Sequence, residues 1–189
     1  MLKYPEVFTT PPDQVIYFYS VLQPKLLELE KNNKIVNLVQ GFNSELYLER
    51  DPSTHLVVVI DDLMSSDDYL HFSDLFTKYS RHLNITVIFM TQNPYFKGTN
   101  SAVKYNRTIL QNSNELVLFK NRRDQVSPMS IGKQAFPSRF PFFKEVYEEC
   151  TKEPFSYLYL SFNASGDEDL TLRSHIFFPI EVPRIYLER

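Results

Sequence analysis

The amino-acid sequence predicts an α/β protein, a three-layer sandwich in which a central, mainly parallel sheet lies between layers of helices. Short apolar runs alternate with helical patterns along the chain, as in parallel sheets with crossover helices. Several of these runs are apolar at consecutive positions, which is typical of strands covered on both faces. The chain has 189 residues, which is the usual length of one domain. We therefore expect residues 1–189 to form a single α/β domain.

The predicted elements follow one another in a regular order. Six strands are expected, at residues 15–20, 34–40, 55–61, 85–92, 115–121 and 156–162. Amphipathic helices are expected at 23–32 and 67–82, where apolar residues recur on a charged background. A later helix at 140–151 should end before Pro154, and LRSHIFFPI, residues 172–180, should form a closing strand.

Composition excludes several classes of protein. Hydrophobic residues make up 43% of the chain and charged residues 23%, which excludes wholesale disorder, coiled coil and collagen. The lone cysteine, Cys150, has no partner for an intramolecular disulfide. No apolar run approaches the roughly 18 residues that cross a bilayer, and the first ten residues lack the pattern of a signal peptide. We expect a soluble, intracellular protein with no membrane partner.

Charge is distributed unevenly along the chain. The formal net charge is −3, yet the segment from Lys97 to Arg139 holds eight Lys or Arg residues and two acidic ones, a local balance of +6. We call this segment the basic strip. A basic strip on an acidic body indicates a surface that faces a polyanion, although a solvated basic face is an equally simple interpretation.

The most informative segment is HLVVVIDDLM, an apolar strand that runs directly into Asp61 and Asp62. Ligands of open α/β sheets bind at the carboxyl ends of the strands. In a Walker B motif, such a strand fixes a carboxylate that holds Mg²⁺ against nucleotide phosphates, and a second carboxylate polarises the attacking water. The alternative is that the two aspartates simply cap the turn after the strand.

The next predicted strand ends in polar residues as well. ITVIFMTQNP places Thr91, Gln92 and Asn93 after one crossover helix, so these side chains and the aspartates should meet at one edge of the sheet. An amide at this position can contact a γ-phosphate or the water that attacks it.

Taken together, VVVIDDLM, ITVIFMTQNP and NRTILQNSNELVLFKNRRD resemble the FtsK/HerA-type P-loop ATPases, and most closely the genome-packaging ATPases of Polinton and adintovirus-like elements. Thr91, Gln92 and Pro94 match the TQ-x-P segment of that superfamily. The resemblance covers nearly the whole chain and implies a P-loop NTPase-like fold of the additional-strand type. It also implies that Mg²⁺ and ATP are the cofactors. In a viral protein, it would imply a location in the nucleus or the virion.

The resemblance also implies roles for individual residues. Asp61 would be the Mg²⁺ ligand, Asp62 the acid that activates water and Gln92 the sensor, with Thr91 and Asn93 beside the nucleotide. In the homo-oligomeric ring of such a motor, Arg107 and Arg123 are candidates for the arginine that reaches the neighbouring subunit's γ-phosphate. Lys97, Lys104 and Arg107 would contact double-stranded DNA without sequence preference.

Two departures from the family are visible in the sequence. The four glycines form neither GxxxxGK[ST] nor GxGxxG, so the N-terminal β-loop-α unit that carries the family's Walker A motif is missing. We therefore expect a truncated or degenerate ATPase that is inactive alone. The family also usually has Glu, one methylene longer, at the position of Asp62.

Two other functions are compatible with the same residues. The chain could be a non-catalytic α/β scaffold or interaction module derived from such an ATPase. A weaker alternative is a Mg²⁺-dependent nuclease that uses Asp61, Asp62 and Asp74, although no lysine follows these acids at the usual nuclease spacing.

Overall fold

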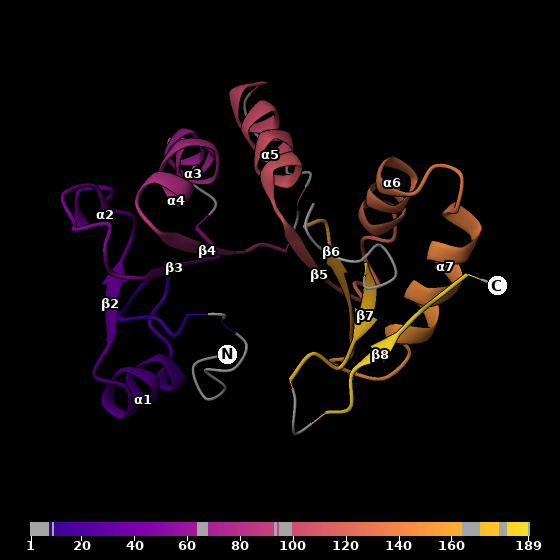
Figure 1. Cartoon of the computed structure of the whole chain (residues 1–189), viewed down its shortest axis with the longest axis horizontal. Coiled ribbons are helices and arrows are strands. Elements are labelled where there is room, and N and C mark those ends of the chain that lie inside the picture. The colour runs from indigo at the N-terminus through magenta and orange to yellow at the C-terminus, as the bar shows by residue number, and fades with distance from the viewer. Residues whose placement is uncertain are drawn as a thin grey trace. The chain divides into compact units, whose positions relative to one another are not determined.

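The computed structural model describes residues 8, 10–63, 68–92, 94, 100–163, 171–177 and 181–188, and it gives only the backbone of 100–104. The chain divides into two compact units, Leu2–Asn112 and Ser113–Arg189, which we call the N-terminal and C-terminal units (Figure 1). Each is described by itself. The single-domain expectation stays a prediction, because a compact unit is not by itself an independently folding domain.

The N-terminal unit is built on a four-stranded, all-parallel sheet with the order β2-β1-β3-β4. Its strands are β1 (Gln14–Tyr19), β2 (Val36–Gln40), β3 (Leu56–Asp61) and β4 (Ile85–Met90). Each is one of the predicted strands. The register sets Val58 of β3 opposite Ile16 of β1 and Val87 of β4. An α/β fold with a parallel sheet is thus confirmed for this unit.

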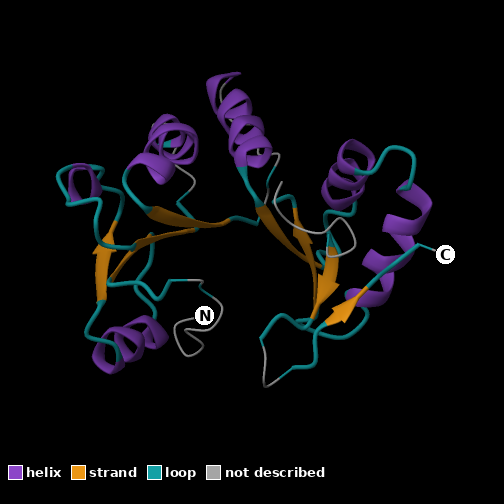
Figure 2. Ribbon diagram, in the orientation of Figure 1, coloured by secondary structure: helices purple, strands orange, loops and turns teal. Residues whose placement is uncertain are grey.

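Helices cover both faces of this sheet (Figure 2). They are α1 (Pro24–Asn32), α2 (Glu45–Leu48), α3 (Tyr69–Asp74), the π-helical segment η2 (Leu75–Tyr79), α4 (Ser80–His82) and α5 (Asn100–Asn112). The predicted helix at 67–82 corresponds to the continuous run α3–η2–α4, and its π-helical middle is a feature that the apolar pattern does not indicate.

The side chains of β3 explain why both faces need cover. Val58 and Ile60 point into a core completed by α3, η2 and α5, for example by Phe72 and Leu75. The alternate residues of β3, such as Val59, point to the opposite face and belong to a second core on the side of α1. Because successive side chains of a strand alternate between faces, a strand that is apolar at every position must be buried on both sides.

The C-terminal unit has a different sheet. Its strands are β5 (Glu115–Phe119), β6 (Tyr157–Ser161), β7 (Leu172–Ser174) and β8 (Arg184–Ile185), which pair antiparallel in that order. The expectation that all six predicted strands share one mainly parallel sheet is therefore wrong for β5 and β6. Of the expected closing strand, only the first three residues are β7, and 178–180 lie outside the described residues.

Two helices join β5 to β6, namely α6 (Val126–Ala135) and α7 (Phe140–Cys150). One crossover helix returns the chain to the end from which a parallel strand can start, whereas a pair of helices leaves it at the other end. This connection accounts for the antiparallel direction of β6. The α7 side chains Phe143 and Val146 are buried, as are Leu158 and Leu160 of β6, which α7 contacts.

None of the helices in the described part of the chain is long and apolar enough to cross a membrane.

Candidate functional site

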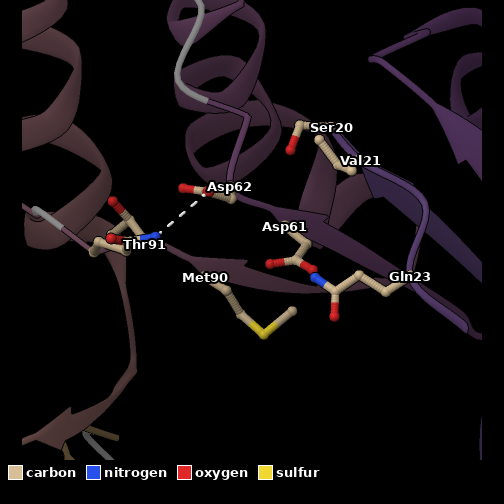
Figure 3. A pocket seen from close by; sticks show the side chains of 8 residues that line it. Ser20, Val21, Gln23, Asp61, Asp62, Met90 and Thr91 are labelled. Atoms are coloured by element: carbon tan, nitrogen blue, oxygen red, sulfur yellow. Dashed lines mark hydrogen bonds between the residues drawn. The ribbon is translucent and has the colours of Figure 1, made fainter. Parts of the chain in front are cut away.

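An open crevice of about 320 Å³ lies at the carboxyl edge of the parallel sheet (Figure 3). Three neighbouring strands contribute to it through the residues at or just after their ends. The lining residues are Ser20, Val21, Gln23, Asp61, Asp62, Met90, Thr91 and Gln92. This is the edge at which open α/β sheets bind ligands, and it is where the sequence predicts a site.

Asp61 is the last residue of β3, and in the sheet it lies opposite Tyr19 of β1 and Met90 of β4. Its side chain is half-buried. The hydroxyl of Tyr17 donates a hydrogen bond to Oδ2 of Asp61 at 2.9 Å. Burial raises the pKa of Tyr17 well above its ordinary value, and the hydrogen bond to Asp61 and the negative charge of that carboxylate raise it further. The phenol therefore stays protonated and acts as a donor.

Asp62 has a left-handed backbone with a φ of 52°. Its N–H donates to the carbonyl oxygen of Met90 at 3.3 Å, which continues the ladder between β3 and β4 by one bond. The side chain is exposed, and its Oδ2 accepts a bond from the Gln92 amide at 3.5 Å. Among residues other than glycine, Asp and Asn adopt such a φ most readily, and non-glycine residues held in this region are found often at functional sites.

The two neighbouring aspartates are thus held apart by different strands. Figure 3 shows the carboxylate of Asp62 on the side of Thr91, and that of Asp61 nearer Gln23 and Met90. The carboxylate of Asp61 accepts a hydrogen bond from Tyr17 of β1, and that of Asp62 accepts one from Gln92, which follows β4. The structure therefore brings four of the predicted site residues together and gives the two acids different surroundings.

The other predicted site residues either lie wholly or partly outside the described part of the chain or are exposed and do not line the crevice. Asn93 and Lys97 lie outside the described residues, and the side chain of Lys104 is not described. Arg107 is exposed on α5 and does not line the crevice. Arg123 is exposed in the C-terminal unit, in the loop after β5, where its backbone N–H donates to Asn121 Oδ1 at 2.9 Å. The roles of these five residues stay predictions.

The three acids of the nuclease alternative do not form a metal site. Asp74 pairs with Lys78 on the same helical run, at 2.8 Å between Oδ1 and Nζ. Across the described ranges, no three His, Cys, Asp or Glu side chains are placed so that they could hold a metal ion. A centre made of Asp61, Asp62 and Asp74 therefore gains no support from the geometry.

The crevice lining suits the Mg²⁺ ion of a Mg²⁺–nucleotide complex better than it suits the phosphates. Its carboxylates, hydroxyls and two amides offer oxygen atoms of the kind that Mg²⁺ prefers as ligands. Mg²⁺ bound with a nucleotide needs only one or two carboxylates, because phosphates and waters complete its shell. Phosphates need cationic or N–H donors. Neither Lys nor Arg is among the lining residues, which include two acids.

Some lining residues have no signal in the sequence. Ser20, Val21 and Gln23 join the crevice because β1 lies beside β3, and Tyr17 supports it for the same reason. The strand order that places β1 there cannot be taken from the apolar runs.

Together, the fold and the site define a parallel α/β unit with an acidic, amide-containing crevice at its carboxyl edge. No family model, curated protein or solved structure matches the chain.

Proposed function

We propose that the chain is the ATPase core of a DNA-packaging or DNA-translocating motor of the FtsK/HerA type. One observation supports this most directly: Asp61 and Asp62 at the end of β3, and Gln92 just after the neighbouring parallel strand β4, line the same crevice. The resemblance of the sequence around these three residues to such ATPases is the second support.

Each residue has a separate task in this proposal. Mg²⁺, when bound, neutralises charge on the phosphate oxygens during transfer. Asp61, fixed by Tyr17, would hold that ion. Asp62, exposed and left-handed, would orient and polarise the attacking water, and Gln92, which bonds to Asp62, would keep that carboxylate facing the crevice. A firmly held acid suits the role of metal ligand. A loosely held acid suits the role of general base.

The phosphate-binding groups must come from residues beyond the crevice lining. Within the described sheet, β4 is the last strand on its side, and its outer edge pairs with no described strand. A strand added there in parallel would end at the crevice and would carry the loop that follows it to the same place. We therefore expect this chain alone to hydrolyse ATP at no measurable rate. Turnover that disappears in Asp61→Ala would contradict that expectation.

A binding experiment tests the cation site without nucleotide. The 189-residue chain is titrated with Mn²⁺, a substitute for Mg²⁺, and free Mn²⁺ is followed by electron paramagnetic resonance. The wild type and Asp74→Asn, which removes an acid outside the crevice lining, should bind one ion with similar affinity, and Asp61→Ala should lose it. Equal binding by wild type and Asp61→Ala would reject the site.

DNA binding tests the motor part of the proposal. Lys120, Arg122, Arg123 and Lys133 of the basic strip are exposed, as is Arg139, which is paired with Glu188 at 2.6 Å. Affinity for duplex DNA should fall steeply with salt because each phosphate contact releases counterions. Replacing Lys97, Lys104 and Arg107 by alanine should flatten the log–log salt slope by roughly one unit per lost contact.

A matched control separates a local effect from net charge. Lys25, Lys31 and Lys34 are exposed and lie outside the basic strip, so their triple alanine variant changes the charge equally. It should leave the salt slope near that of the wild type. Equal slopes for all three proteins would reject the basic strip as a DNA-contacting surface.

A non-catalytic scaffold is the alternative, and one observation favours it. The backbone bond from Asp62 to Met90 is what a strand-ending turn needs, whatever the side chain does. In this case Mn²⁺ would not bind, and alanine at Asp61 or Asp62 would change only stability.

A further inference from the structure

The carboxylate of Asp61 has one partner among the described side chains, and that partner comes from another strand. Tyr17 lies in β1, opposite Val59 in the register and therefore two residues before the position opposite Asp61. From there its ring reaches along the sheet, so that the hydroxyl donates to Oδ2 at 2.9 Å. No described residue donates to Oδ1 of Asp61.

The ring of Tyr17 is held in place by apolar neighbours. It packs against the core on the α1 face of the sheet, which contains Val15, Val57 and Val59. Both Tyr17 and Asp61 belong to paired β-strands, so neither backbone is free to move relative to the other. A donor on such a rigid support can restrict a carboxylate to one orientation.

Asp62 provides the comparison within the same site. Its partner is the amide of Gln92 at 3.5 Å, at the outer limit of a hydrogen bond, and both side chains are exposed. The hydrogen bond from Tyr17 to Asp61 is 0.6 Å shorter and is half-buried. Only one of the two acids is therefore fixed before a ligand arrives.

We propose that Tyr17 is a positioning residue of the crevice: its hydroxyl fixes Oδ2 of Asp61 and leaves Oδ1 as the oxygen that binds a divalent cation. This inference rests on the proposed function, since it assigns the cation to Asp61. Tyr17 does not touch the cation and acts through the carboxylate. Loss of a hydrogen-bond partner behind a metal ligand typically costs 10- to 100-fold in metal affinity.

Tyr17→Phe tests this in the Mn²⁺ titration of the 189-residue chain, because it removes the hydroxyl and keeps the ring that packs on the valines. We expect affinity to fall about tenfold, with the urea midpoint recorded alongside. Tyr19→Phe is the control, since Tyr19 is two residues further along the same strand and is buried but does not line the crevice. It should bind Mn²⁺ as the wild type does.

A second variant separates positioning from general loosening of the fold. In an Asp61→Ala background, Tyr17→Phe should change any residual Mn²⁺ affinity no further, because the carboxylate through which it acts is gone. Wild-type affinity in Tyr17→Phe would overturn the inference, and so would an equal loss in Tyr19→Phe.

The experiments distinguish failure of the proposed cation site from failure of the positioning role of Tyr17. If the wild type binds no Mn²⁺ at millimolar concentrations, the proposed cation site is rejected, and the hydroxyl proton of Tyr17, observed by NMR in metal-free protein, decides the remaining question. A slowly exchanging proton that is lost in Asp61→Ala supports the positioning of Asp61. A proton that exchanges alike in both proteins overturns it.

Discussion

The parallel sheet of the N-terminal unit and the antiparallel sheet of the C-terminal unit differ in how their strands are covered. In β3, every residue from Leu56 to Ile60 is buried, and Asp61 is the first that is not. In β5, exposure alternates, and Val117 and Phe119 are 45% and 55% exposed. A strand covered on both faces can offer chemistry only at its ends, whereas an alternating strand offers a whole face. This explains why the candidate site lies at the edge of the first sheet.

The largest expected effect tests this difference in cover directly. Ile60→Ala should lower the free energy of unfolding by about 2–5 kcal/mol, because Ile60 is fully buried and its truncation leaves a cavity. Val117→Ala, on half-exposed β5, should change it by no more than about 0.5 kcal/mol. Urea unfolding followed by circular dichroism measures both, and similar losses would show that the two strands are covered equally.

A smaller effect is expected where α6 meets α7 in the C-terminal unit. A Cβ at Gly132 would overlap the ring of Phe143, so Gly132→Ala should destabilise by about 1–3 kcal/mol. The sign is informative, since in an unobstructed helix the same change stabilises by roughly 1 kcal/mol. Combining it with Phe143→Leu, which removes the ring, should cost less than the two single changes added together. Stabilisation by Gly132→Ala alone would contradict the close packing of these helices.

The smallest effect concerns the pH dependence of the C-terminal unit. Burial raises the pKa of the Cys150 thiol, so the folded state holds the thiol proton more tightly than the unfolded state does. The stability that this contributes is fully present below the unfolded thiol pKa of about 8.5 and is lost as the pH rises through the folded value. Urea midpoints between neutral pH and pH 10 should therefore fall more steeply for wild type than for Cys150→Ala. Parallel curves would show that the thiol has the same pKa in both states.

Local pattern predicts the strands of this chain better than it predicts their partners. The six apolar runs are all strands, because burial of consecutive apolar residues needs little more than the run itself. Pairing depends on the connections: one crossover helix sets β4 parallel to β3, but the pair α6 and α7 reverses β6, and the pattern at Phe140 alone does not reveal that reversal.

In the candidate site too, contacts between consecutive strands can be predicted from the sequence, whereas contacts that depend on strand order cannot. Asp61 and Gln92 come together because β3 and β4 are consecutive strands of one crossover unit, which the sequence does reveal. Tyr17 could not be predicted, because it reaches Asp61 only if β1 lies beside β3, and strand order is a property of the whole sheet. A tyrosine is also common in β-strands for packing alone, so its presence there does not indicate a function.

The left-handed backbone at Asp62 bears on which acid this position accepts. Asp and Asn adopt a positive φ several-fold more often than other residues with side chains, because their short polar groups bond locally, and a left-handed residue otherwise costs roughly 1–2 kcal/mol. With φ at 52°, the turn after β3 favours the shorter acid, so main-chain conformation by itself disfavours glutamate at this position.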